Sequence, residues 1–166
     1  MLTQTRIRPY SVSLLLEVSR YASDDVDPAQ GAIWNLRPLF PNDIAWDRER
    51  EQVEAALPGF AALKGTLGSD PKALQSALER ISDIRQRLRR LGAYAHLKAD
   101  EDTTVEENQA RVQLITGLQA RFDESTSFVR PEILALGRER IQSFERANPE
   151  LRRHQSGVGI EAIGDS

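Results

Sequence analysis

The sequence predicts an all-α protein: a long antiparallel helical hairpin with one helix before it and a short helix after it. Three observations support this fold class. Apolar residues recur with the helical period over two long segments, and helix-capping signals stand in front of three segments. No segment shows the strict alternation of apolar and polar residues that is typical of a strand.

The composition is that of an ordinary globular domain. Hydrophobic residues make up 40% and charged residues 28% of the 166 residues, enough for a real core. The formal net charge of −3 argues against nucleic-acid binding, which draws most of its affinity from basic residues on phosphate. No apolar run approaches the ~20 residues that span a bilayer. The absence of cysteine suits a reducing compartment, so we expect a cytoplasmic protein.

Residues 1–32 are expected to form an N-terminal extension and linker. A short apolar stretch at residues 12–16 follows two arginines, which raises the alternative of a secretory signal. Charged residues interrupt that stretch and no small-residue cleavage site follows it, so an extension is the preferred interpretation. Residues 23–32 are polar and contain Pro28 and Gly31, as a linker does.

The first helix is expected to begin at Asn42. An asparagine side chain at this position accepts hydrogen bonds from the unpaired N–H groups of the first turn, and Asp43 complements the helix dipole. Pro58 should bend or interrupt the rod, which then continues to Gly65. The tryptophans that flank this start, Trp34 and Trp46, are interpreted as packing anchors rather than ligand-stacking residues.

The hairpin is expected to begin at Asp70, an N-cap followed by proline at the first helical position. One apolar stripe then continues to the end of the helix near Asp102: Leu74, Ala77, Ile81, Ile84, Leu88, Leu91 and Ala95. Thr104 and Glu107 have the spacing of a capping box that opens the second long helix. Because the turn is very short, the two helices should pack antiparallel.

The second long helix is expected to end before Pro131. Its predicted buried face comprises Val112, Leu114, Ile115, Leu118, Phe122 and Val129. A last short helix from Arg138 to Asn148 should bury Ile141 and Phe144. Residues 155–166 are rich in glycine and lack a helical period, so we expect a disordered tail.

No catalytic, cofactor-binding or metal-binding residue is predicted. The two histidines, His96 and His154, stand far apart, and no His-Glu-x-x-His pair occurs that could hold zinc on one helix. Both are interpreted as partly exposed helical residues. Gly-rich phosphate loops and the Gly-x-Ser-x-Gly elbow are also absent. The three tyrosines have no base in evidence: Tyr10, Tyr21 and Tyr94.

Two charged clusters leave alternatives open. Asp100-Glu101-Asp102, with Glu106 and Glu107 beyond the turn, is interpreted as a solvated turn, the alternatives being a site for a hard cation or for a positively charged partner. The basic run from Arg85 to Arg90 is interpreted as a solvated face, because on a helix its arginines point in about four directions. The alternative is a patch for an acidic partner or nucleic acid.

Three strings in a fixed order are similar to those of the oligoendopeptidase F family. The first is Trp34-Asn35-Leu36-Arg37-Pro38-Leu39-Phe40-Pro41-Asn42-Asp43 followed by Ala45-Trp46. The second is Leu91-Gly92-Ala93-Tyr94-Ala95-His96-Leu97 with Asp100-Glu101-Asp102-Thr103-Thr104, and the third is Phe128-Val129-Arg130-Pro131-Glu132-Ile133-Leu134-Ala135-Leu136. The resemblance covers roughly residues 33–154, and Asn35 stands where the family usually has aspartate.

The resemblance implies a specific role. The family consists of zinc metallopeptidases that cleave oligopeptides inside a helical body, with a His-Glu-x-x-His motif far downstream of the matched region. Residues 33–154 would therefore form a non-catalytic N-terminal helical domain, part of the wall of the peptide-binding cavity, and be inactive alone. Zinc belongs to the full-length family, not to this chain. No catalytic residue can be carried over.

The tail after His154 departs from the family, which continues there with more helix. We therefore expect a truncated or frameshifted reading frame, or a domain fragment. The expected partner is the missing catalytic domain, or a second copy bound through the uncovered apolar face, with oligopeptides bound only in an intact enzyme. The alternative function is a stand-alone helical protein–protein interaction module.

Overall fold

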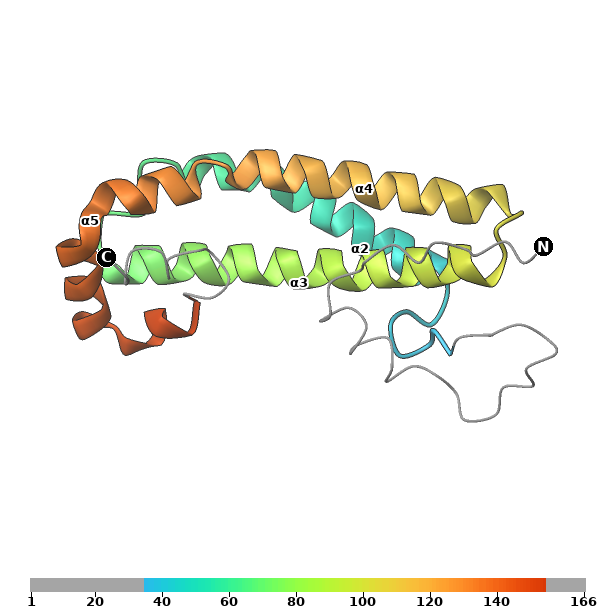
Figure 1. Ribbon diagram of the computed structural model, residues 1–166, viewed down its shortest axis with the longest axis horizontal. Helices are drawn as coiled ribbons and strands as arrows, with labels where there is room; N and C mark the ends of the chain where they lie inside the picture. Colours follow the sequence, from blue (N-terminus) through green and yellow to red (C-terminus); the bar gives the residue numbers. More distant parts are fainter. Residues whose placement is uncertain (1–34, 155–166) are drawn as a thin grey trace, which may run out of the picture.

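The computed structural model describes residues 35–154, and every secondary-structure element in this part of the chain is a helix (Figure 1). The elements are α2 (Asp43–Ala56), the 3-10 helix η1 (Leu57–Leu63), α3 (Pro71–Glu101), α4 (Glu106–Thr126), α5 (Val129–Ala147) and the 3-10 helix η2 (Pro149–His154). The all-α fold class is confirmed. The predictions for residues 1–34, which include the packing role of Trp34, and for residues 155–166 lie outside the described residues.

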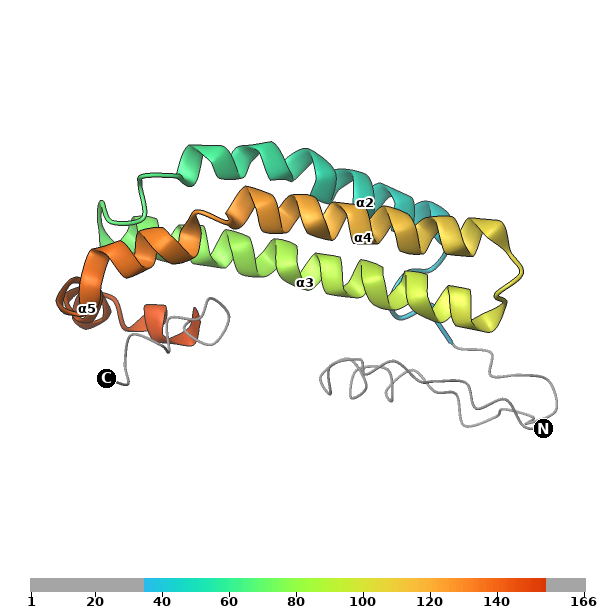
Figure 2. The same cartoon turned by 45° about the horizontal axis from the view of Figure 1, so that its top comes forward.

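Helices α3 and α4 form the predicted antiparallel hairpin, and α2 lies along it (Figures 1 and 2). Helix α3 is the centre of the molecule, since it packs against α4, α2, α5 and η2. The core follows its length from Leu74 through Ile81 and Leu88 to Tyr94, each at most 2% exposed. No helix within residues 35–154 combines the length and the apolarity needed to cross a bilayer.

The starts of α2 and α3 are confirmed where the sequence predicts them. Asn42 Oδ1 accepts a hydrogen bond from Ala45 N at 2.9 Å. Asp70 Oδ1 accepts from Lys72 N at 2.8 Å and from Ala73 N at 3.0 Å. Each cap satisfies N–H groups that the helix cannot pair internally, so both helices begin at fixed residues.

The predicted capping box at the start of α4 is wrong. Thr104 turns back and donates to Asp102 Oδ1 from its backbone N at 2.9 Å and from its hydroxyl at 2.6 Å. Because a carboxylate is a stronger hydrogen-bond acceptor than a neutral group, Thr104 forms this turn with Asp102 and does not cap α4. The N-cap of α4 is Val105, without a side-chain hydrogen bond. Buried Asn108 holds the turn instead by donating to Lys98 O at 2.9 Å.

Three residues of the buried face predicted for the second long helix are confirmed, Val112 is only partly buried against the core, and buried Val129 belongs to α5. Ile115, Leu118 and Phe122 are buried, whereas Leu114 is 50% exposed. Leu114 lies about 100° around the helix from Ile115, on the side turned away from α3. An apolar residue beside the stripe was therefore wrongly counted as part of it.

The chain between residues 127 and 147 differs from the prediction. A new helix, α5, begins at Val129 and includes Pro131 as its third residue, where the missing N–H group has no helical partner to lose. Gly137 interrupts α5 with a φ of 75°, a conformation that glycine adopts readily. The predicted helix from Arg138 corresponds to the part after this kink.

Candidate functional site

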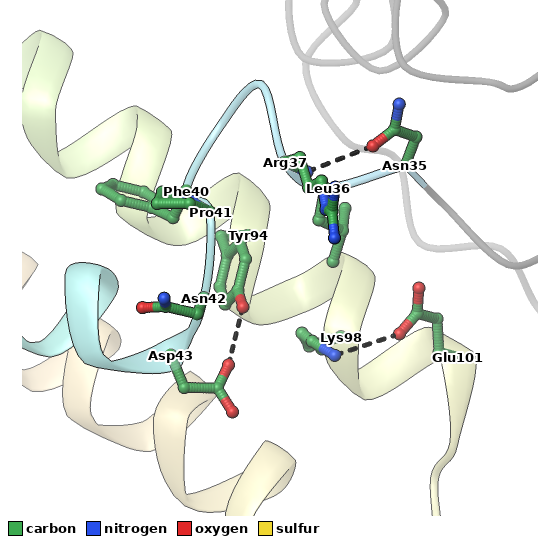
Figure 3. Close-up of a pocket in the computed structure, with 10 residues that line it drawn as sticks. All are labelled: Asn35, Leu36, Arg37, Phe40, Pro41, Asn42, Asp43, Tyr94, Lys98 and Glu101. Atoms are coloured by element: carbon green, nitrogen blue, oxygen red, sulfur yellow. Dashed lines mark hydrogen bonds and ion pairs between the residues drawn. The ribbon is translucent and has the colours of Figure 1, made fainter.

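A pocket of about 450 Å³ lies between the loop before α2 and the last turns of α3 (Figure 3). It is the candidate site because it brings the first and second family-like strings together. The loop, the start of α2 and α3 contribute its lining: Asn35, Leu36, Arg37, Phe40, Pro41, Asn42, Asp43, Tyr94, Lys98 and Glu101. Its size lies within the range of small-molecule pockets.

The Asp43 carboxylate at the edge of this pocket joins three helices. Its Oδ1 accepts from the Tyr94 hydroxyl at 2.6 Å, and its Oδ2 accepts from Arg111 Nη2 at 2.7 Å. Arg111 Nη1 also donates to Asn108 Oδ1 at 2.8 Å. One carboxylate therefore ties the start of α2 to α3 and α4.

Burial first, and the neighbouring Asp43 carboxylate second, raise the pKa of Tyr94 above its ordinary value. Both causes oppose a tyrosinate, because they favour the neutral hydroxyl that donates to Asp43. Tyr94 is thus a hydrogen-bond donor in the fold and is unsuited to act as a base or nucleophile near neutral pH.

Other polar groups in these two strings and next to them also form hydrogen bonds inside the protein. Trp46 is fully buried, and its Nε1 donates to Leu91 O at 2.9 Å, which confirms its predicted role as a packing anchor. Arg90 Nη2 donates to Leu39 O at 2.9 Å. The Phe40 ring meets the Tyr94 ring edge-on, with centroids 5.5 Å apart. These contacts hold the loop and α2 against α3.

The third family-like string fastens the opposite end of the hairpin. Glu132 of α5 accepts from Gly65 N and Leu67 N, each at 2.9 Å, through its two carboxylate oxygens. The Leu136 side chain packs so closely on Gly68 that an added Cβ there would lie 2.4 Å from Leu136 Cδ2. Through these contacts, α5 holds the loop between η1 and α3 in place.

The histidines and the acidic turn are not brought into one site. His96 is half-buried on α3, and His154 ends η2, where its side chain is not described. Glu101 pairs with Lys98 at 3.5 Å. Within residues 35–154 no three or more metal-ligating side chains are grouped so that they could hold a metal ion.

The basic run is less solvated than the sequence suggested. Arg87 Nε pairs with Glu49 Oε1 at 2.6 Å, and the predicted pair with Asp83 is present at 3.9 Å. Arg85 lies over the Phe122 ring at 5.9 Å from its centroid. The arginines of this run point in different directions, as expected, but Arg87 joins α3 to α2 and Arg85 joins α3 to α4. The interpretation as one solvated face is therefore wrong for those residues.

Sequence reasoning did not find the pocket or the Tyr94–Asp43 pair. The two residues are 51 positions apart, and only the packing of α2 on α3 brings them together. The one available signal was their presence in two separate family-like strings.

The comparisons with known proteins agree with those strings. Oligopeptidase PepF of Bacillus subtilis is 30% identical over 125 residues, which cover 75% of this chain and 19% of that protein. Group B oligopeptidase PepB of Streptococcus agalactiae is 32% identical over 121 residues, which cover 73% of this chain and 20% of that protein. No family model matches the sequence.

A solved structure shares the fold. The crystal structure of a protein assigned as a peptidase from Chlamydophila abortus matches with a TM-score of 0.62 and 30% sequence identity, over 72% of this chain and 20% of that one. The chain thus spans about a fifth of the length of the relatives it matches.

Proposed function

This chain belongs to the oligoendopeptidase F family, and from that premise we propose that it is a non-catalytic N-terminal helical domain of an oligoendopeptidase F-like metallopeptidase. In the intact enzyme it forms part of the wall around the peptide-binding cavity. By itself it is inactive.

One observation carries this proposal: the residues of the family-like strings are engaged in packing. Asp43 and Tyr94 join helices, Trp46 anchors α2, and Glu132 clasps the loop before α3. Groups used in this way build and fix a helical body. They leave no nucleophile paired with a base, which acyl-transfer or general-base chemistry requires.

Zinc is the metal that the family resemblance implies for the whole enzyme. The side chains described in this chain do not fit a zinc site, because among residues 35–154 no three or more metal-ligating side chains are grouped so that they could hold a metal ion. The sequence also lacks the histidine pair that a helical zinc site needs. We therefore assign no catalytic step to this chain.

A second candidate function is a stand-alone helical interaction module. Three large apolar side chains favour it: Ile44 is 64% exposed, and Leu114 and Leu134 are each 50% exposed. Such residues can dock another helical surface, including the rest of a longer enzyme. Light scattering distinguishes the two cases, because a module that works by self-association gives a dimer that Leu114→Gln dissociates.

The first test is peptide hydrolysis by the purified chain. With quenched fluorescent oligopeptides and added zinc we expect no turnover, while PepF of Bacillus subtilis serves as the positive control. Hydrolysis that a chelator abolishes would overturn the proposal.

The second test is a chimaera of PepF in which the 125 matched residues of this chain replace their counterparts in PepF. Because the proposed role is structural, the chimaera should keep kcat within about tenfold, a change of ~1.4 kcal/mol in the barrier. A folded chimaera without activity would contradict an equivalent role for the two segments.

A further inference from the structure

The first part of α5, residues 129–136, is apolar on two opposite sides. Its inner side packs into the core, where Val129 is 3% and Ile133 is 2% exposed. Its outer side carries three exposed apolar residues: Pro131, Leu134 and Ala135. At about 100° per residue these three fall within about 100° of arc, opposite the inner side. A helix that is apolar on both sides is normally buried on both sides.

The polar residues of this part of α5 do not make its outer side polar. Glu132 is directed to the loop before α3, where its carboxylate accepts from Gly65 N and Leu67 N, each at 2.9 Å. Arg130 lies only at the edge of the outer side, about 40° around the helix from Leu134. The outer side is therefore an apolar surface without a partner among residues 35–154.

The part of α5 after the kink at Gly137 is different. Its inner side buries Ile141 and Phe144. Its exposed positions before Ala147 are all polar: Arg138, Glu139, Arg140, Gln142, Ser143 and Arg146. This is the pattern of a helix with one side in water. A missing partner is therefore indicated only for residues 129–136.

Leu114 of α4 provides the contrast, because it is 50% exposed, as Leu134 is. The side of α4 that faces away from α3 carries exposed polar residues: Gln109, Gln113, Thr116, Asp123 and Glu124. Leu114 is a single large apolar residue next to that polar side. Scattered residues of this kind are normal on a protein surface and need no partner.

The chain leaves the described helices at the same end of the hairpin as α5. The 3-10 helix η2, which ends at His154, packs against both α3 and α5, and Figure 1 shows it beside α5. In the relatives about four fifths of the protein lie outside the matched segment. A continuation of this chain past His154 therefore starts at the α5 end of the hairpin.

We propose that the outer side of α5, formed by Pro131, Leu134 and Ala135, is the surface on which the remainder of the intact enzyme packs against this domain. The inference rests on the proposed function, because it takes the rest of an oligoendopeptidase F-like enzyme as the partner. The partner meets this side with an apolar surface of its own, since burial of apolar area drives such contacts.

The test measures how accessible position 134 is in the isolated chain and in the PepF chimaera. The chain contains no cysteine, so one introduced thiol reports on one position. Leu134→Cys is the probe and Leu114→Cys is the matched control, because both leucines are 50% exposed. Each protein is labelled with a maleimide, and the labelled peptides are quantified by mass spectrometry.

We expect both thiols to react at similar rates in the isolated chain. In the chimaera the Leu134→Cys thiol should react at least about tenfold more slowly, because labelling then requires local opening of the contact. The Leu114→Cys thiol should keep its rate. Unaltered PepF allows the same comparison without depending on the folding of the chimaera, with cysteines at the positions aligned with Leu134 and Leu114.

Three results would overturn the inference. One is a Leu134→Cys thiol that reacts equally fast in the chimaera and in the isolated chain. Another is equal reactivity of the two aligned positions in PepF. The third is labelling of Leu134→Cys in the isolated chain that slows as the protein concentration rises, because a second copy would then cover this side.

Failure of this inference can be told apart from failure of the proposed function. An active chimaera whose Leu134→Cys thiol reacts freely contradicts only the packing surface on α5. A folded but inactive chimaera contradicts the proposed function, and the labelling rate at position 134 is still measured in it.

Discussion

The pair between Tyr94 and Asp43 should measurably stabilise the packing of α2 on the hairpin. We consider three variants: Tyr94→Phe, Asp43→Asn, and the double variant that carries both. Tyr94→Phe removes only a hydroxyl from a residue that is 2% exposed. Asp43→Asn keeps the shape of the side chain but removes the charge that accepts from Tyr94 at 2.6 Å and from Arg111 at 2.7 Å.

The expected magnitudes follow from burial. A hydrogen bond to a charged group contributes about 1.5–3 kcal/mol when buried, but the Asp43 side chain is 44% exposed, so solvent screening reduces this. We expect Tyr94→Phe to lower the free energy of unfolding by about 1–2 kcal/mol. Asp43→Asn should cost about 1.5–3 kcal/mol, because the Arg111 side chain also loses its charged partner.

A double-mutant cycle measured by urea unfolding isolates the pair. We expect a coupling energy of about 1 kcal/mol between the two substitutions. Asp47→Asn is the matched control on the same helix: its pair with Arg50 is 3.7 Å long and Asp47 is 52% exposed, so it should cost less than about 0.5 kcal/mol. Purely additive effects, or a control as costly as Asp43→Asn, would refute the reasoning.

Three further predictions follow from other contacts. Glu132→Gln should lower the free energy of unfolding by about 1–2 kcal/mol, since one of its two backbone hydrogen bonds is lost; an unchanged urea midpoint would contradict the clasp. Leu118→Ala should cost about 2–4 kcal/mol and Leu114→Ala less than about 0.5 kcal/mol, because only Leu118 is buried; similar costs would show that α4 is rotated from its assigned position. The hydrogen bond from Arg121 lowers the pKa of Glu54 from 4.5. The ionised Glu54 side chain therefore stabilises the folded protein above pH 4.5, and this contribution is lost as the pH falls through the lowered pKa. Unfolding curves of Glu54→Gln and the unaltered chain should therefore converge in acid, and a gap that persists there would count against the pair with Arg121.

The elements that the sequence predicted well have strong local signals. Asp70 and Pro71 fix the start of α3 within one residue of the prediction, because an N-cap and a proline at the first position depend on nothing distant. The stripe from Leu74 to Leu91 similarly predicted which side of α3 is buried, and every member of it is buried.

The failures arose where a competing interaction decided the outcome. Thr104 had the spacing of a cap, but Asp102 lies two residues away and offers a charged acceptor. Pro131 was taken as a helix end, although the first turn of a helix accepts proline equally well. The chain's sequence alone could not choose between these positions.

The candidate site was beyond local reasoning for a different reason. The pocket needs the loop around Arg37 to lie beside the end of α3, and that arrangement depends on the Trp46–Leu91 and Arg90–Leu39 hydrogen bonds. Contacts between residues about 50 positions apart leave no periodic signal in a single sequence. The family-like strings marked the participants without indicating their partners.

The central claim is that the family-like residues hold a helical body together and take no part in chemistry. Introducing Tyr94→Phe into the PepF chimaera tests it most directly, with kcat and thermal stability measured on the same sample. We predict a lower Tm together with a kcat at 25 °C that stays within about twofold, because stability and catalysis are then separate. A kcat reduced about a hundredfold at an unchanged Tm would contradict the claim, since it would place Tyr94 in the reaction.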